Sequence, residues 1–279
     1  MKTLGYYNGQ YGPLEEMNVP MTDRAVYYGD GVYEATPARN GVVYAIDAHV
    51  DRMFRSASLL RINVPVDKQT LKSELKRMVS LMDDKDVLVY WQVSRGTGLR
   101  AHPFPEGKAN LMMMLTPSHY PNLSEPVSCI TEEDTRFLHC NIKTINLIPS
   151  IMAMQKAKEN GCYEAIFHRG ERVTECSKSN VHILKNGVLV TAPADNLILA
   201  GIARMHLFEA CKTLGIPVEE RPYSISDLMN ADEIFTSSSS SFLRRVTRVD
   251  GVPAGGKDEN TATALRQYVW QRFLNETDQ

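Results

Sequence analysis

The chain has 279 residues, of which 43% are hydrophobic and 23% are charged, which is ordinary for a globular protein of one large domain or two of about 100–150 residues. Its net charge of −2 gives no electrostatic reason to expect nucleic acid or an anionic membrane as a partner. No run approaches the roughly 18 apolar residues of a membrane span. The first residues also lack the hydrophobic core of a signal peptide, so we expect a cytoplasmic protein.

The cysteines and histidines do not form a recognisable metal motif. The chain has five cysteines without a C-x-x-C pair and seven histidines without an H-E-x-x-H pair. We therefore expect reduced, mostly buried thiols and no metal site.

Strand and helix signals alternate in the first half of the chain. Extended segments bounded by turn residues are expected at 3–8, 27–36, 42–46, 87–94 and 110–115. One helix is expected to begin after Asp47, a good N-cap, with Arg52 off its apolar face, and another to run over about 68–82. The loop 95–105 follows the fourth strand.

The segment 117–126 contains three prolines and few apolar residues, so a linker between two domains is expected there. Further strands are expected at 127–131, 163–168, 181–184, 188–191 and 234–236, the last leading into the serine run Ser237–Ser241. Helices are expected over 149–161, 201–215 and about 260–274. This order favours an α+β protein of two parts, with domains at 1–118 and 126–279 and a linker at 119–125.

A single lysine, Lys143, stands among apolar residues just before the helix start at Pro149. Burial of lysine is costly, and an amine held partly out of water has a lowered pKa and can form a Schiff base with a carbonyl. An edge strand from which Lys143 points to solvent would give the same pattern.

Two further polar stretches could bind charged groups. Arg100 and His102 lie in a glycine- and proline-rich loop that could grip a carboxylate, or that could be a solvated surface loop. Glu175 lies in the stretch 174–180, where it could pair with a protonated ring nitrogen, or the stretch could be a hairpin turn.

The segment that begins at Gly201 could bind a phosphate. The backbone N–H groups of Ile202 and Ala203 would lie at a helix start, where unpaired donors and the helix dipole favour an anion. The serine run Ser237–Ser241 could form a second wall of the same site, or could be a serine-rich turn.

Considered together, these blocks resemble the fold-type IV pyridoxal-phosphate enzymes, a family of branched-chain aminotransferases, D-amino-acid aminotransferases and aminodeoxychorismate lyases. The matching blocks are G-D-G-V-Y-E at 29–34, H-V-D-R at 49–52, S-R-G-T-G-L-R-A-H at 94–102, I-K-T-I-N at 142–146, T-E-C-S-K-S-N at 174–180 and G-I-A-R at 201–204. The resemblance implies a two-domain α+β fold with mixed sheets and packed helices. The small N-terminal α/β domain would precede a large domain carrying the Schiff-base lysine.

The resemblance also implies roles in binding pyridoxal 5′-phosphate. Lys143 matches the lysine that forms the Schiff base, and Glu175 matches the carboxylate that binds the pyridine nitrogen. Leu199 matches a leucine that packs against the cofactor ring, and Glu164 matches, more weakly, a carboxylate near the lysine.

The phosphate of the cofactor is the second group for which the resemblance implies partners. Arg52 matches the phosphate arginine. It would be helped by the backbone of Ile202 and Ala203 and by a hydroxyl of Ser238 or Ser239.

Within the family, the chain is most similar to the D-amino-acid aminotransferases, because it combines Tyr33 with R-x-H at 100–102. These three residues would bind the substrate carboxylate, with Arg100 and His102 supplied by the partner subunit of a homodimer. The resemblance implies transfer of the amino group from D-amino acids such as D-alanine or D-glutamate to 2-oxoglutarate or pyruvate. The alternatives are an L-branched-chain aminotransferase, an aminodeoxychorismate lyase and a cofactor-binding protein that has lost catalysis.

Three positions depart from the family pattern. Ala203 replaces a threonine, so one hydroxyl for the phosphate is missing. Lys178 replaces a small serine and is expected to point outward, and Cys176 replaces a glycine in the turn after Glu175.

Overall fold

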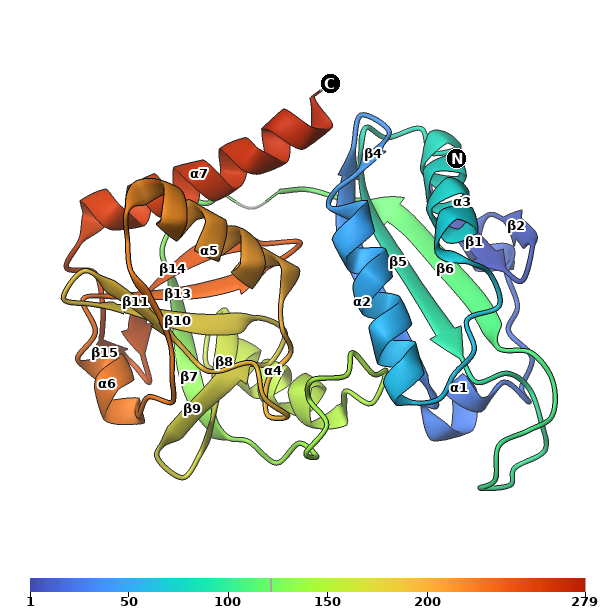
Figure 1. The fold of residues 1–279 in the computed structure, drawn as a ribbon, viewed down its shortest axis with the longest axis horizontal. Coiled ribbons are helices and arrows are strands. Elements are labelled where there is room, and N and C mark those ends of the chain that lie inside the picture. Colours follow the sequence, from blue (N-terminus) through green and yellow to red (C-terminus); the bar gives the residue numbers. More distant parts are fainter. Residues whose placement is uncertain (121, 279) are drawn as a thin grey trace. The chain divides into compact units, whose positions relative to one another are not determined.

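A computed structural model describes residues 1–120 and 122–278. The contacts within the chain divide it into two compact units (Figure 1). Unit 1 consists of Met1–Tyr120, Ile142–Asn146 and Phe273–Gln279, and unit 2 consists of Pro121–Asn141 and Leu147–Arg272.

The segment with Lys143 belongs to unit 1, although the sequence placed it in the domain 126–279. It is held there by backbone pairing with strand β3 (Gly31–Arg39). The N–H of Tyr33 donates to the Lys143 carbonyl at 3.0 Å, and the N–H of Ile145 donates to the Gly31 carbonyl at 3.2 Å. This pairing is between distant parts of the chain, so local sequence patterns do not contain it. The change of unit after Tyr120 falls inside the expected linker, but the exact domain limits stay a prediction.

In the described residues, unit 1 contains a six-stranded antiparallel sheet in the order β2-β1-β6-β5-β3-β4. Its other strands are β1 (Leu4–Tyr7), β2 (Gln10–Gly12), β4 (Val42–Val43), β5 (Asp86–Ser94) and β6 (Asn110–Pro117). Its helices are η1 (Leu14–Glu16), α1 (Arg24–Tyr28), α2 (Ile46–Leu59) and α3 (Lys68–Ser80). Alternate residues of β5, including Val89 and Trp91, are fully buried in the core under α2 and α3 (Figure 1).

Helix α2 begins one residue before the expected cap. Ala45, with φ of 49°, occupies the N-cap position. Asp47 lies in the first turn, where the positive end of the helix dipole stabilises a carboxylate. The buried face of α2 is also wider than its apolar stripe, because it includes His49 and Arg52, which are 0% and 5% exposed. These polar side chains are buried because Glu34, on the sheet beneath them, gives both a partner.

Unit 2 contains a mixed sheet in the order β12-β11-β10-β13-β14-β7-β8-β9, with β15 paired to β14, among the described residues. Its strands are β7 (Val127–Glu133), β8 (Glu164–Arg169), β9 (Arg172–Cys176), β10 (Asn180–Lys185), β11 (Val188–Thr191), β12 (Val218–Glu220), β13 (Glu233–Ser238), β14 (Phe242–Val249) and β15 (Val252–Pro253). Strands β7 and β8 pair in parallel, whereas β8 and β9 are antiparallel.

Three of the helices described in unit 2 are close to their expected bounds, and another was not expected. The three are α4 (Ile148–Glu159), α5 (Ile202–Leu214) and α7 (Glu259–Thr277), the last of which ends in unit 1, and the unexpected helix is α6 (Ile225–Met229). Gly201 is the N-cap of α5, and Gly215, with φ of 71°, ends it, as the sequence indicated. Strand β14 was not expected, because its arginines hide the apolar pattern; two of them, Arg244 and Arg245, are buried.

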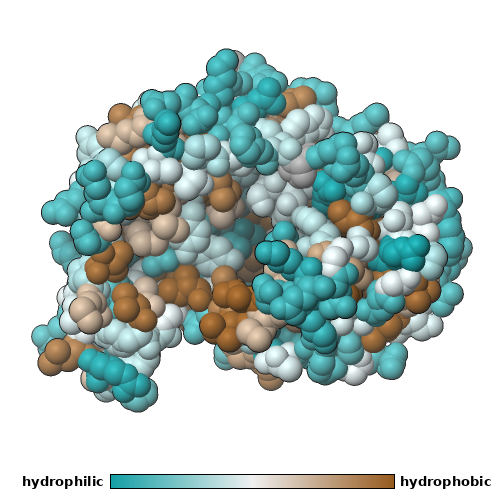
Figure 2. Space-filling model, turned by 180° about the vertical axis from the view of Figure 1, so that it is seen from behind, coloured by the Kyte–Doolittle hydropathy of each residue, from teal (hydrophilic) through white to brown (hydrophobic). Residues whose placement is uncertain are grey.

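The surface is mainly hydrophilic on the face shown in Figure 2, where hydrophobic residues form small groups. No helix in 1–120 or 122–278 has both the length and the apolar character that a membrane span requires. The cytoplasmic location stays a prediction.

Candidate active site

The expected site residues are divided between the two units. Unit 1 holds one set, namely Tyr33, Arg52, Arg100, His102 and Lys143. Unit 2 holds the other set, namely Glu175, Leu199, Ile202, Ala203, Ser238 and Ser239.

Lys143 lies beside Tyr33 in unit 1. Its side chain is half-buried, and its Nζ is 4.2 Å from the centre of the Tyr33 ring. The Ser56 hydroxyl of α2 also lies 3.3 Å from the Lys143 backbone nitrogen. Tyr33 in turn stacks on Tyr90 of β5, with the ring centres 5.5 Å apart. The lysine therefore projects from a fixed backbone beside an aromatic face, rather than from a free edge strand.

Arg52 forms a buried ion pair with Glu34, a residue that the sequence did not single out. Arg52 Nε donates to Glu34 Oε1 at 2.7 Å and Arg52 Nη2 donates to Oε2 at 2.8 Å. His49 Nδ1 lies 2.7 Å from Glu34 Oε2. Burial opposes ionisation of Glu34, but Arg52 and His49 outweigh it and lower the pKa of Glu34 to about 2. Burial lowers the pKa of His49, which favours the neutral imidazole as the donor to Glu34.

Arg100 and His102 lie together at the end of an anchored loop. The Arg100 guanidinium is 5.2 Å from the centre of the Tyr28 ring, and the His102 ring centre is 5.5 Å from it. Both side chains are exposed, as is Leu99, at 86%. Of the three residues expected to bind the substrate carboxylate, Arg100 and His102 both lie beside Tyr28, whereas Tyr33 lies beside Lys143.

The base of this loop is held by Arg24, which the sequence did not assign a role. Arg24 Nη1 donates to the Ala101 carbonyl at 2.7 Å, and Arg24 Nε donates to Asp30 at 2.7 Å. Arg95 Nε donates to the same carboxylate at 2.8 Å, and its guanidinium lies 3.6 Å from the centre of the Phe104 ring. These contacts fix the loop on both sides of the exposed tip that carries Arg100.

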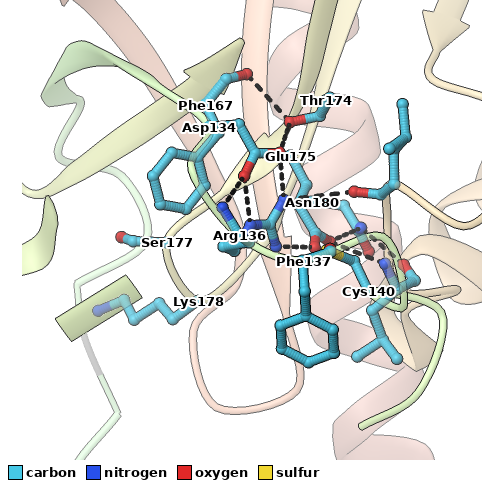
Figure 3. Close-up of polar contacts among 12 residues, drawn as sticks. Asp134, Arg136, Phe137, Cys140, Phe167, Thr174, Glu175, Ser177, Lys178 and Asn180 are labelled. Atoms are coloured by element: carbon cyan, nitrogen blue, oxygen red, sulfur yellow. Dashed lines mark hydrogen bonds and ion pairs between the residues drawn. The ribbon is translucent and has the colours of Figure 1, made fainter. Parts of the chain in front are cut away.

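Glu175 is the carboxylate of the expected set in unit 2, and three groups donate to it. It is the second-last residue of β9 and is 6% exposed. Its Oε1 accepts from Arg136 Nη1 at 2.5 Å, and its Oε2 accepts from Asn180 Nδ2 at 3.1 Å and from Leu199 N–H at 3.0 Å (Figure 3). Burial raises the pKa of the Glu175 carboxyl, and Arg136 and the Leu199 N–H oppose that rise.

Arg136 and Asp134 complete this cluster, and no sequence pattern separates them from ordinary charged loop residues. Arg136 Nε and Nη2 donate to the two oxygens of Asp134, both at 2.9 Å. The Asp134 side chain is 0% exposed and also accepts from Thr174 Oγ1 at 3.0 Å and from Arg169 Nε at 3.2 Å. Figure 3 shows these groups converging from β9 and the loop after β7.

The start of α5 lies next to the Glu175 cluster through Asn180. Asn180 Nδ2 donates to both Glu175 and the Leu199 carbonyl, the latter at 2.8 Å. A Cβ on Gly201 would lie 2.1 Å from Asn180 Oδ1, so this close approach requires glycine. The first N–H groups of α5, at Ile202 and Ala203, have no partner within the helix.

The serine run forms the turn between β13 and β14. Ser238 closes this turn, because its Oγ accepts from the Ser241 N–H at 3.2 Å. One strand residue earlier, Ser237 Oγ lies 2.8 Å from Nε2 of the fully buried His182. The serine run is therefore a turn that is fixed at its base. Its role as a second wall of a phosphate site stays a prediction.

Lys178 points away from Glu175, as expected (Figure 3). Its side chain is exposed, and its Nζ lies 4.5 Å from the centre of the Tyr163 ring. Its backbone N–H donates to Glu164 at 2.6 Å, and Ser179 Oγ donates to the same carboxylate at 2.8 Å. Glu164 therefore holds the turn between β9 and β10.

Comparison with known proteins shows the family of this chain. The model described as amino-transferase class IV matches residues 31–249. The chain belongs to this family. The "D-alanine aminotransferase" of Listeria monocytogenes serotype 1/2a (strain 10403S) is 40% identical over 275 residues, which cover 96% of this chain and 94% of the relative. The predicted family is thus confirmed.

Solved structures confirm the predicted α+β, fold-type IV fold. Mixed sheets were expected with it; the sheet of unit 2 is mixed, whereas the sheet of unit 1 is antiparallel among the described residues. The branched-chain aminotransferase from the archaeon Thermoproteus uzoniensis, solved with norvaline, matches with a TM-score of 0.90, covering 98% of this chain and 95% of that one, at 23% identity. The T.th. branched-chain amino acid aminotransferase complexed with N-(5′-phosphopyridoxyl)-L-glutamate matches with a TM-score of 0.88, covering 99% and 94%, at 24% identity.

Proposed function

We propose that this class IV aminotransferase is a D-amino-acid transaminase that uses pyridoxal 5′-phosphate. It would move the amino group of a D-amino acid, such as D-alanine or D-glutamate, to 2-oxoglutarate or pyruvate. The family membership, the 40% identity to a D-alanine aminotransferase and the pair Arg100 and His102 support this proposal.

One arrangement in unit 2 carries the choice of cofactor. Asn180 donates to the buried carboxylate of Glu175 and to the Leu199 carbonyl, and it packs against Gly201, the N-cap of α5. The carboxylate suits a protonated ring nitrogen and the helix start suits a phosphate, which are the two polar ends of pyridoxal phosphate. The structurally similar T.th. aminotransferase holds a phosphopyridoxyl compound. The residues present therefore fit this group.

Lys143 would hold the cofactor covalently, with Arg52 and the N–H groups of Ile202 and Ala203 holding its phosphate, helped by Ser238 or Ser239. Leu199 would pack against the ring. When bound, pyridoxal phosphate supplies an aldehyde that joins an amine and a ring that accepts the electron pair left at the substrate Cα.

Lys143 would also move the proton of the reaction. Its Nζ would take the proton from the substrate Cα as a base and return it as an acid. Tyr33, whose ring lies 4.2 Å from Nζ, limits where this amine can go. With the substrate carboxylate bound by Tyr33, Arg100 and His102, only one enantiomer would present its α-hydrogen to Lys143.

A homodimer with shared sites is part of this proposal. Arg100 and His102 are exposed at the end of a loop that also exposes Leu99 and Phe104, at 86% and 51%. Large apolar side chains grouped on a loop are characteristic of surfaces that a partner covers. Arg100 and His102 would then act on the substrate of the partner subunit.

The test is a transamination assay with the cofactor-loaded protein. D-Alanine with 2-oxoglutarate should yield pyruvate, while L-leucine, the substrate of the branched-chain alternative, should react far more slowly. Lys143→Ala should lower turnover by on the order of 10²–10⁴-fold, the usual contribution of a general base. Equal or faster reaction of L-leucine would refute the D-amino-acid assignment, and full activity of Lys143→Ala would refute the role of this lysine.

A further inference from the structure

Arg136 links two carboxylates in unit 2, and the proposed function gives it no group of the substrate to bind. Its Nε and Nη2 are committed to Asp134, and its Nη2 also approaches the Leu197 carbonyl at 3.3 Å. The Phe167 ring packs 4.7 Å from the guanidinium. The side chain is 11% exposed, so the guanidinium has one orientation, with Nη1 directed at Glu175 Oε1.

The hydrogen bonds of Glu175 identify the oxygen that remains available. A carboxylate oxygen accepts about two hydrogen bonds. Asn180 and the Leu199 N–H already occupy Oε2, whereas Oε1 accepts only from Arg136 among the described residues. A ring N–H would therefore bind to Oε1, the same atom that Arg136 contacts.

One proton would lie between Glu175 and the ring nitrogen, on either the carboxylate or the ring. Moving it to the ring carries positive charge away from the guanidinium, which lies on the protein side of the carboxylate. Because like charges repel strongly in a buried site, a fixed positive charge at Arg136 favours the ring position. The other charges near Glu175 are Asp134 and, through it, Arg169; neither forms a hydrogen bond to the Glu175 carboxylate that the structure describes.

We propose that Arg136 is a positioning residue that keeps the shared proton on the cofactor ring rather than on Glu175. This inference rests on the proposed function, because it requires pyridoxal phosphate to bind with its ring nitrogen at Glu175. A protonated ring accepts the electron pair from the substrate Cα better than a neutral ring does. Asp134 contributes by fixing the orientation of Arg136.

The test measures the proton directly rather than through activity. Wild-type protein is loaded with pyridoxal phosphate labelled with ¹⁵N in the ring, and the ¹⁵N chemical shift distinguishes a protonated from an unprotonated ring. We expect the protonated shift in the wild type and in Arg136→Lys, which retains the charge. In Arg136→Gln the shift should move toward that of an unprotonated ring.

Arg169→Gln is the matched control. Arg169 donates to Asp134 and, at 2.7 Å, to the Arg136 carbonyl, but not to Glu175. This variant loses a cation of the same cluster and should retain the protonated ring. If Arg136→Gln does not fold because Asp134 loses its partner, the double variant Asp134→Asn with Arg136→Gln removes both charges and carries the same expectation.

The outcomes separate this inference from the proposed function. A protonated ring that persists in Arg136→Gln or in the double variant would overturn the inference and leave the function intact. An equal loss of the ring proton in Arg169→Gln would also overturn it, since contact with Glu175 would then not matter. Failure of the wild type to bind the labelled cofactor would instead overturn the proposed function.

Discussion

Each unit contains an arginine, mostly out of solvent, whose guanidinium is held by a carboxylate with a 0% exposed side chain. In unit 1 Glu34 holds Arg52 through two hydrogen bonds, and in unit 2 Asp134 holds Arg136 in the same way. The difference is one more group: Arg136 contacts a second carboxylate, Glu175. The series of paired charges thus ends with a cation, Arg52, in unit 1 and with an anion, Glu175, in unit 2. In the proposed function, Arg52 would bind the phosphate of the cofactor and Glu175 would bind its protonated ring nitrogen.

The largest effect should come from removing the carboxylate in unit 1. Glu34→Gln leaves the 5% exposed Arg52 without its charged partner, which typically costs about 3–5 kcal/mol. Urea unfolding at pH 7 measures this loss. Because the pKa of Glu34 is lowered to about 2, its stabilising effect is present above its unfolded pKa near 4.5 and is lost as the pH falls from there toward 2.

The control for Glu34 is a second glutamate–arginine pair of unit 1. Glu74 and Arg77 pair on α3, but Arg77 is 39% exposed, so Glu74→Gln should cost under about 1 kcal/mol. The difference between wild type and Glu34→Gln should also narrow below pH 4.5. Equal losses for the two variants, or a difference that does not change with pH, would contradict the account of the unit 1 cluster.

In unit 2 the corresponding change should affect turnover more than folding. Glu175→Gln retains the shape of the side chain, and Arg136 retains Asp134, so urea unfolding should change less than in Glu34→Gln. Loss of the anion at the ring nitrogen should lower kcat/KM for D-alanine by on the order of 10²–10³-fold, as for other well-placed electrostatic groups in active sites. If Glu175→Gln unfolds as easily in urea as Glu34→Gln does but keeps the wild-type kcat/KM for D-alanine, the two carboxylates do not differ in role as proposed.

Arg100 provides an exposed arginine with which to compare Arg52 and Arg136. Arg100→Ala should raise KM for D-alanine by about 10–100-fold, because a hydrogen bond to a charged group contributes about 1.5–3 kcal/mol. Stability should stay within about 0.5 kcal/mol, since the side chain is exposed. Steady-state kinetics and urea unfolding on one preparation measure both; an unchanged KM would rule out the carboxylate-binding role.

The smallest effect concerns the missing hydroxyl in the first turn of α5. Ala203→Thr should tighten cofactor binding by about fivefold, the equivalent of about 1 kcal/mol for one hydrogen bond. Ala203→Val has the same branched shape without the hydroxyl and serves as the control. Titration of the cofactor-free protein with pyridoxal phosphate gives both affinities. If the two variants bind alike, the hydroxyl is not what the family threonine contributes.

The fold was largely predictable, because its elements have local signals. Helix α5 runs between two glycines, and the buried side of α7 is the apolar stripe of Ala262, Leu265, Val269 and Phe273. Strand β14 was missed because its buried arginines hide its apolar pattern. Arg245 pairs with Glu233, which no local pattern reveals.

The site was predictable only where the family motifs reach. Glu175 and Lys143 stand in such motifs. Glu34 also stands in one, the block at 29–34, but the block does not reveal its pairing with Arg52, and Arg136 and Asp134 lie outside every matching block. Their importance comes from burial and from pairing, and Arg136 lies 39 positions before the carboxylate that it contacts. Sequence periodicity cannot detect contacts of that kind.

The central claim is that this aminotransferase acts on D-amino acids through a bound cofactor. The most direct measurement mixes the cofactor-loaded protein, without any amino acceptor, separately with D-alanine and with L-alanine, and follows the cofactor absorbance in a stopped-flow instrument. The account predicts a rapid change to the pyridoxamine-phosphate spectrum with D-alanine and little or no change with L-alanine over the same time. A change that is as fast or faster with L-alanine, or no change with D-alanine, would contradict it.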